Sequence, residues 1–289
     1  MATNNRVITV PASDGFEWRE THAGPVLVCC ALEPYAAHLF TTRRWPLGSA
    51  PDGDRTAAWA DVAAALGVDV AHLARAHQVH GASVLVRRAG DPPHRDAPLP
   101  EADIIISDDP AIVLAIQTAD CVPLLIADRR TGAIAAAHAG WRGLAASVPR
   151  VTVDALFHHF GSRPADLIAA VGPSIGACCY EVGVDVLDAF RLGGFDEATR
   201  HRWFFTRPQP SPTNPPMPGL REAERADRWF FDGWMATRYQ LERAGIPADQ
   251  IHSAKLCTAS HPETLCSYRR DGKAAGRIAG AIRVSPRRP

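Results

Sequence analysis

Four apolar runs follow one another closely in the middle of the chain. They cover residues 102–107, 112–117, 122–127 and 133–137, and only short polar turns separate them. Short apolar runs bounded by turn residues are typical of buried β-strands, whereas helices need longer segments. The sequence therefore predicts a β-rich core at the centre of the fold.

Helices are expected on both sides of this core. Apolar residues recur at helical spacing in residues 57–66, 70–76, 144–160, 183–190 and 233–244, while Val26–Val28 and residues 83–86 read as strands. Residues 207–219 are rich in proline and polar side chains, which suits neither a helix nor a central strand, so an exposed insertion loop is expected there. We predict an α/β fold in which one domain, residues 1–289, has a β-rich core covered by helices.

Charge and cysteine usage limit the classes of partner. Lys plus Arg and Asp plus Glu number 31 each, so no overall field attracts nucleic acid or a membrane surface. No window approaches the roughly 18 uncharged apolar residues of a membrane span, and the first residues lack the pattern of a signal peptide. Seven cysteines, including two adjacent pairs, make a poor disulfide framework. We expect a cytoplasmic protein with reduced thiols and no nucleic-acid or membrane partner.

A turn at residues 128–132 joins the last two apolar runs. Folding the chain back about Arg130 places Cys121 opposite His138 in an antiparallel pair. Directly opposed side chains have Cβ atoms about 5 Å apart, close enough for a thiolate and an imidazole to share a metal ion. A slip of one residue would put them on opposite faces.

Two kinds of chemistry are open to this pair. Zinc favours thiolate and imidazole ligands, and a catalytic zinc site keeps three protein ligands, for which His80 is the natural third member. Alternatively, His138 accepts the proton of Cys121 and makes a nucleophilic thiolate, with Asp120 orienting the imidazole. Only the metal site requires His80.

Several strings around these residues resemble the laccase-domain family. Members were long described as multicopper polyphenol oxidases and are now understood as zinc-dependent purine nucleoside phosphorylases; the family includes the peptidoglycan editing factor. The matching strings, in family order over about 200 residues, are QVHG (78–81), TADC (118–121), AAHAGWRG (136–143), GPSIGACCYEVG (172–183) and SYRRDG followed by GR (267–272 and 276–277).

The resemblance implies both a fold and a site. The fold is an α-β-β-α layered sandwich related to the cysteine-hydrolase-like toxins. His80, Cys121 and His138 correspond to the metal ligands, with Cys121 and His138 also expected to be catalytic and zinc the expected metal, copper being the alternative. Five residues are expected to bind substrate and phosphate: Gln78, Arg142, Arg269, Arg270 and Arg277. Among the arginines, Arg142 and Arg269 are favoured.

The implied activity is phosphorolysis of adenosine, inosine or methylthioadenosine, with deamination of adenosine as a second activity. Alternatives are a hydrolase that edits a peptidoglycan precursor or uses Cys121 and His138 as a cysteine-type centre, a copper polyphenol oxidase, and a non-enzymatic module stabilised by zinc. The oxidase is disfavoured because the chain has no His-x-His pair. The module would need a fourth ligand. The oligomeric state is left open.

Overall fold

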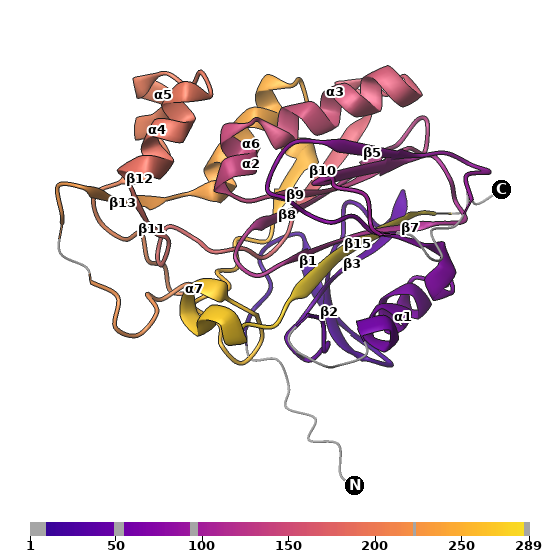
Figure 1. Ribbon diagram of the computed structural model, residues 1–289, viewed down its shortest axis with the longest axis horizontal. Helices are drawn as coiled ribbons and strands as arrows, with labels where there is room; N and C mark the ends of the chain where they lie inside the picture. The colour runs from indigo at the N-terminus through magenta and orange to yellow at the C-terminus, as the bar shows by residue number, and fades with distance from the viewer. Residues whose placement is uncertain (1–9, 49–54, 93–97, 222–223, 286–289) are drawn as a thin grey trace, which may run out of the picture.

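The computed structural model describes residues 10–48, 55–92, 98–221 and 224–285. The described residues form two six-stranded sheets and a small three-stranded one (Figure 1). The first sheet has, in spatial order, β1 (Phe16–Thr21), β2 (Gly24–Cys29), β3 (Ala36–Thr41), β15 (Ile278–Val284), β7 (Val113–Thr118) and β4 (Leu73–Ala74).

The second sheet carries the other central strands. Its order is β14 (Ile251–Ser253), β10 (Leu167–Val171), β8 (Val122–Asp128), β9 (Ile134–Ala139), β6 (Ile104–Ser107) and β5 (Val84–Arg87). The small sheet, to one side, has the order β11 (Glu181–Gly183), β13 (Arg228–Phe231) and β12 (Phe204–Phe205). The four predicted apolar runs thus form β6, β7, β8 and β9, although in different sheets.

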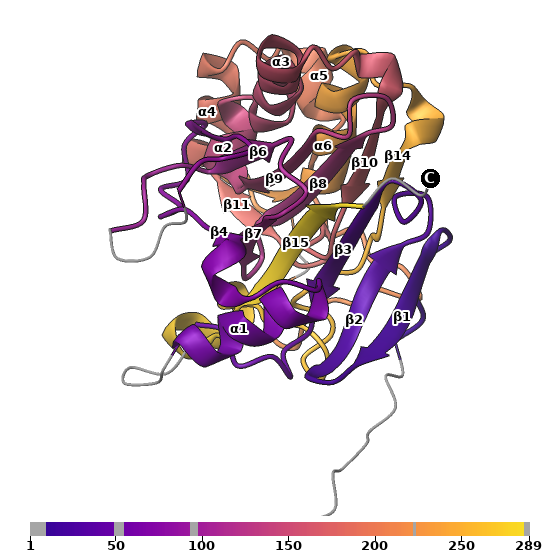
Figure 2. The same ribbon diagram turned by 90° about the vertical axis from the view of Figure 1, so that its right-hand side faces the viewer.

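The two large sheets pack face to face, and helices cover their outer faces (Figure 2). Side chains alternate between two cores, as a strand buried on both faces requires. In β8, Leu124 and Ile126 pack toward the helices, whereas Leu125 packs toward the other sheet. In β7, Leu114 faces the space between the sheets and Val113 faces the outer helix. This arrangement confirms the mixed α/β expectation and explains why these strands are apolar on both faces.

The helices divide between the layers. α1 (Arg55–Ala65) covers the first sheet, and α2 (Trp141–Ala145), α3 (Val148–Phe160) and α6 (Gly233–Arg243) cover the second. The others lie outside these layers: α4 (Val184–Leu192), α5 (Glu197–His201), α7 (Tyr268–Asp271) and the 3-10 turns η1 (Val70–His72), η2 (Pro164–Asp166), η3 (Ala248–Gln250) and η4 (Gly272–Ala274). No helix in the described ranges is both long and apolar enough to cross a bilayer.

Two helix predictions are wrong in part. The segment 70–76 forms only the turn η1 before β4, which pairs in parallel with β7. The expected helix 144–160 is broken between α2 and α3, where Ser147 has a φ of 60°. Pro149 lies in the first turn of α3 and has no N–H to bond back to α2, so a new helix starts there.

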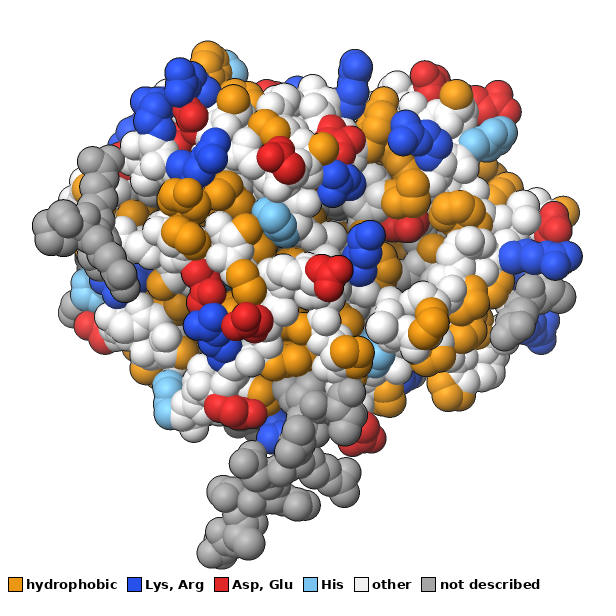
Figure 3. Space-filling view, turned by 180° about the vertical axis from the view of Figure 1, so that it is seen from behind, with side chains coloured by type: hydrophobic (Ala, Val, Ile, Leu, Met, Phe, Trp, Pro, Cys, Tyr) orange, Lys and Arg blue, Asp and Glu red, His pale blue; other side chains and the backbone are white. Residues whose placement is uncertain are grey.

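The proline-rich segment 207–219 contains neither helix nor strand, as predicted. Its Asn214 is nevertheless buried, with 5% of its surface exposed, and its side chain bonds the carbonyl of Lys255 and the N–H of Cys257. On the face shown in Figure 3, basic and acidic side chains are interspersed, in keeping with their equal numbers.

Candidate metal centre and active site

The β8–β9 hairpin places Cys121 and His138 on the same face, but not directly opposite each other. His138 pairs with Pro123, and the register therefore sets Cys121 against Gly140, one step beyond the paired residues. The predicted register is wrong by two residues. Because side chains alternate with a period of two, this shift keeps both groups on one face as diagonal neighbours.

Gly140 makes room for the sulfur. A Cβ atom at this position would lie 2.8 Å from the Sγ of Cys121 and 3.2 Å from the Cδ2 of His80. Because Gly140 has no side chain, the thiol of Cys121 opposite it can lie beside the two imidazole rings.

His80 completes the group from the loop between β4 and β5. Its φ is 63°, a left-handed conformation that is uncommon outside glycine. The donor atoms of His80, Cys121 and His138 all lie within 4.8 Å of one another. The three residues differ in solvent exposure: His138 is buried, Cys121 is half-buried and His80 is exposed. The structure therefore brings all three expected ligands together, with access from the side of His80.

Asp103 positions both histidines. Its carboxylate lies 2.8 Å from the Nδ1 of His138 and accepts the backbone N–H groups of His80 at 3.0 Å and Gly81 at 2.6 Å. The side chain is fully buried. The expectation that Asp120 orients the imidazole is wrong. The sequence does contain a signal for Asp103, because its carboxylate directly precedes an apolar strand. A buried carboxylate is stable only when specific partners hydrogen-bond it, so this position indicates a structural or functional role.

Asp120 instead connects loops around the site. It has a φ of 90° in the turn before β8. Its carboxylate accepts the Oγ1–H of Thr258 and the backbone N–H of Arg269, both at 2.6 Å, and its carbonyl accepts the N–H of Ile175 at 2.9 Å. Asp120 thereby fixes the segments that carry the pocket wall and α7 relative to Cys121.

The thiol and the imidazole stabilise each other's charged form. Burial would raise the pKa of Cys121, but the charge of His138 and hydrogen bonds from His138 and His80 outweigh it and lower the pKa to about 6. Burial would lower the pKa of His138, but the thiolate and Asp103 raise it to about 9. Without a metal, therefore, a thiolate–imidazolium pair exists between these values.

The donor set fits a single zinc ion. It offers one thiolate sulfur and two imidazole nitrogens, the ligand types that zinc prefers, and three protein ligands leave a fourth position open. Since the Nδ1 of His138 bonds Asp103, its Nε2 is the free nitrogen. A carboxylate behind a ligating histidine is the usual support of such a site.

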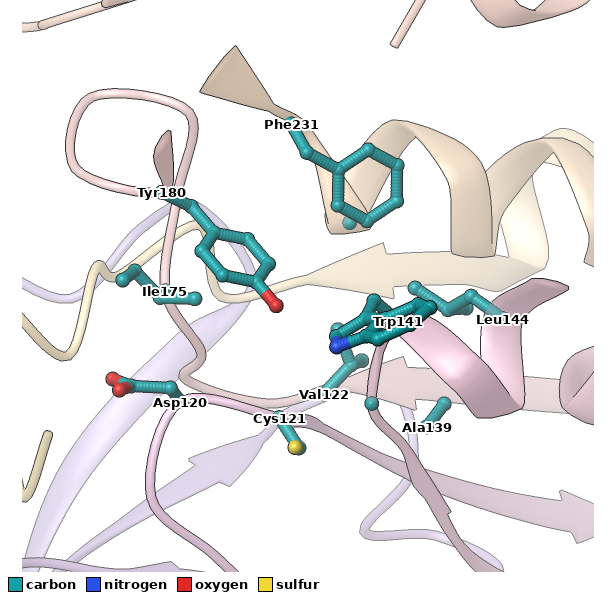
Figure 4. Close-up of a pocket in the computed structure, with 11 residues that line it drawn as sticks. Asp120, Cys121, Val122, Ala139, Trp141, Leu144, Ile175, Tyr180 and Phe231 are labelled. Atoms are coloured by element: carbon teal, nitrogen blue, oxygen red, sulfur yellow. The ribbon is translucent and has the colours of Figure 1, made fainter. Parts of the chain in front are cut away.

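A small pocket that is open to solvent lies beside Cys121 (Figure 4). Aromatic side chains of Trp141, Tyr180 and Phe231 form much of its wall, and Figure 4 shows the Tyr180 hydroxyl directed toward Trp141. Burial and the nearby Cys121 raise the pKa of Tyr180, so its phenol stays protonated. The pocket thus offers flat apolar surfaces and a hydrogen-bond donor.

The four expected anion-binding arginines divide into two pairs. The guanidinium of Arg142 stacks on Trp141 at 4.1 Å, and that of Arg269 lies 5.0 Å from the ring of Tyr180. Both guanidinium groups thus lie against side chains that line the pocket, and that of Arg269 also donates to the carbonyl of Glu181 at 2.6 Å. The guanidinium of Arg270 bonds three backbone carbonyls and Asp271, and that of Arg277 bonds the carbonyls of residues 275 and 276.

Gln78 is used by the neighbouring strand. Its amide nitrogen donates to the carbonyl of Gln117 and its amide oxygen accepts the N–H of Gln117, both at 2.8 Å. The side chain therefore ties the His80 loop to the end of β7 rather than pointing into the pocket beside Cys121.

The chain is similar to several known proteins. Residues 54–285 match the family model described as "Multi-copper polyphenol oxidoreductase laccase". A purine nucleoside phosphorylase of Bacteroides thetaiotaomicron is 37% identical over 63% of this chain and 60% of its own length. One of Deinococcus radiodurans is 36% identical over 87% of this chain and 90% of its own.

Two further similarities extend the comparison. A protein named adenosine deaminase RL5, from an unknown prokaryotic organism, is 31% identical over 75% of this chain and 77% of its own length. The crystal structure of the Bacillus licheniformis hypothetical protein YfiH covers 93% of this chain and 99% of its own, with 26% identity and a TM-score of 0.78.

Proposed function

The chain belongs to the family described as multi-copper polyphenol oxidoreductase laccase, and on that premise we propose that it is a zinc-dependent purine nucleoside phosphorylase. Relatives that carry the name purine nucleoside phosphorylase support the reaction class. The observation that carries the proposal is the convergence of His80, Cys121 and His138 beside an aromatic pocket, with two arginines lying on the rings of Trp141 and Tyr180.

The ligand set favours zinc over copper. Zinc is held well by one thiolate and two imidazoles, and when bound here it would supply Lewis-acid stabilisation of developing negative charge. Multicopper oxidation needs several clustered histidines, whereas the described residues bring only His80 and His138 together with a thiol. A non-enzymatic zinc module would need a fourth protein ligand, and the described part of the chain offers three at this site.

The pocket walls suit a purine nucleoside. The flat faces of Trp141 and Tyr180 can stack on the base, and the Tyr180 phenol can donate a hydrogen bond to a purine nitrogen. The guanidinium groups of Arg142 and Arg269 can bind phosphate through paired N–H donors. The chain thus provides base, anion and metal-ligand functions around one space.

Phosphorolysis breaks the C1′–N9 bond as a phosphate oxygen bonds to C1′. The electrons of the broken bond go to the purine, so the residues near the base act by hydrogen bonding it as charge develops. Arg142 and Arg269 hold the phosphate dianion close to C1′ and reduce the entropy lost in bringing the reactants together. Adenosine, inosine and methylthioadenosine are the proposed substrates.

Two other activities have specific support. Deamination of adenosine is favoured by the relative named adenosine deaminase RL5. A cysteine-type hydrolase, including one that edits a peptidoglycan precursor, is favoured by the lowered pKa of Cys121 beside His138. Only in the hydrolase would His80 be dispensable.

Incubating the protein with a panel of purine nucleosides, with and without phosphate, tests the proposal. Phosphorolysis gives free base and ribose 1-phosphate only when phosphate is present. Inosine formed from adenosine without phosphate would assign deamination instead, and release of an amino acid from a peptidoglycan precursor would assign editing. Base release independent of phosphate would contradict the proposal.

A further inference from the structure

A second group of sulfur atoms lies behind the wall of the pocket. The Sγ atoms of Cys178, Cys179 and Cys257 are all within 4.8 Å of one another, and each side chain is at most 1% exposed. Cys178 and Cys179 precede Tyr180 in a loop. A parallel backbone bridge between Ser174, in the same loop, and Cys257 brings Cys257 next to them. Nothing in the proposed phosphorolysis uses these thiols.

We propose that Cys178, Cys179 and Cys257 form a second metal site that binds a thiophilic d¹⁰ cation through three thiolates. A trigonal ion with sulfur ligands at about 2.3 Å needs sulfur atoms about 4 Å apart, which agrees with the spacing found. Thiolate ligands select zinc and monovalent copper over harder ions. This site is independent of His80 and His138.

The surroundings support sulfur atoms that carry negative charge. The backbone N–H of Gly176 donates to the Sγ of Cys257 at 3.3 Å, and that of Met217 donates to the Sγ of Cys179 at 3.2 Å. The hydroxyl of Ser260 lies 3.6 and 3.5 Å from the sulfurs of Cys178 and Cys179 and donates its proton to the carbonyl of Pro215 at 2.6 Å. The two backbone N–H donors stabilise ligating thiolates in the way that outer groups support metal ligands generally.

The remaining surroundings exclude water. Ile175, Ala259, Met217 and Trp234 pack against the three cysteines. In an apolar site, an unpaired thiolate is costly, and a bound cation compensates its charge.

A disulfide is a poorer account of the same cluster. Adjacent residues have Cα atoms 3.8 Å apart, below the range of about 4.4 to 6.8 Å that disulfides span, so Cys178 and Cys179 do not suit each other. A bond from Cys257 to either one would leave the third thiol buried and unused. A metal ion engages all three.

The ion would connect three segments of the chain. Cys178 and Cys179 lie between Ile175 and Tyr180, which line the pocket, and Cys179 accepts the N–H of Met217 in the proline-rich loop. The N–H of Cys257 donates to Asn214 of the same loop. Metal binding here would therefore fix both the pocket wall and the proline-rich loop.

Metal titration of the reduced, metal-free protein tests the site. Monovalent copper and zinc are titrated separately against a competing chelator. For at least one of the two ions, we expect the wild type to bind one equivalent of metal more than Cys257→Ala. Cys121→Ala should retain that equivalent, and Cys121→Ala/Cys257→Ala should lose it. Cys29→Ala, which removes another fully buried thiol, is the matched control and should bind as the wild type does.

X-ray absorption on metal-loaded Cys121→Ala supplies a second measurement that does not depend on the folding of the Cys257 variant. We expect three sulfur ligands per ion at about 2.3 Å. The proposal would be overturned if Cys121→Ala bound neither ion, or if the ion it held had fewer than three sulfur ligands. The proposal would also be overturned, in favour of a disulfide, if these thiols resisted alkylation in the metal-free protein and became reactive again after treatment with a reductant.

Discussion

The carboxylate of Asp103 lies 2.8 Å from the Nδ1 of His138 and also accepts the backbone N–H of His80 at 3.0 Å. One buried side chain, just before β6, thus positions two of the three proposed metal ligands. It sets the free nitrogen of His138 toward Cys121 and holds His80 in its left-handed conformation.

We expect Asp103→Asn to weaken zinc binding by about 10- to 100-fold, the usual effect of losing such a supporting carboxylate. The amide keeps the size of the side chain but not its charge. Zinc affinity measured by chelator competition checks this, with Asp109→Asn, another buried carboxylate, as the control. Equal affinity in Asp103→Asn and the wild type would show that Asp103 is only structural. A changed pH dependence of binding in Asp103→Asn alone would support the positioning role.

Gly140→Ala should displace the thiol. The added Cβ would lie 2.8 Å from the Sγ of Cys121, closer than real side-chain contacts, so the sulfur must move away from the histidines. We expect most zinc binding to be lost while the fold is retained, as circular dichroism would report. Gly81→Ala is the matched control, because its Cβ would meet neighbours at 3.7 and 3.8 Å. Zinc binding retained in Gly140→Ala would contradict the diagonal geometry.

Much of this arrangement could be predicted from the sequence, because the information is local. The apolar runs gave four central strands, and the short turn at 128–132 put Cys121 and His138 on one face. The predicted pairing of Cys121 with His138 differs by two residues from the observed register, because a turn's geometry depends on hydrogen bonds such as those of Asp128 to residues 130 and 131.

Other features depend on contacts that are distant in the sequence. The long strand β15 completes the first sheet from the end of the chain, and the sulfur cluster unites residues 178 and 257. The arginines carried no local signal to separate them: the guanidinium of Arg269 lies on the ring of Tyr180 and bonds one carbonyl, whereas that of Arg270, its neighbour, bonds three carbonyls and Asp271. Relation to the cysteine-hydrolase-like toxins and the single-domain organisation stay predictions.

Alkylation of Cys121 in the metal-free protein should follow its lowered pKa. The thiolate is the reactive form, so the rate should rise through a midpoint near pH 6 and be slow below it. In His138→Gln the stabilising charge is absent, and the midpoint should move up toward the ordinary value of 9. Mass spectrometry of the Cys121 peptide measures the rate. A wild-type midpoint near 9 would contradict the ion pair, and added zinc should protect the thiol.

Arg142→Gln and Arg269→Gln should each impair the use of phosphate. Losing one charge-assisted contact to phosphate is expected to lower kcat/KM for phosphate by about 10-fold or more. Steady-state kinetics at varied phosphate concentration measure this. Arg191→Gln, on an exposed face of α4, is the control. If neither pocket arginine changed the phosphate dependence, the proposed anion site would lie elsewhere.

The most direct test of a zinc-dependent phosphorylase is the phosphate-dependent release of purine base by His80→Ala. A metal mechanism needs all three ligands, so His80→Ala, Cys121→Ala and His138→Ala should each lose most zinc and most activity. A covalent mechanism needs only Cys121 and His138. We therefore expect chelator-treated His80→Ala to release almost no base. Near-normal turnover by that variant, with Cys121→Ala inactive, would contradict the metal mechanism and assign a covalent mechanism at Cys121.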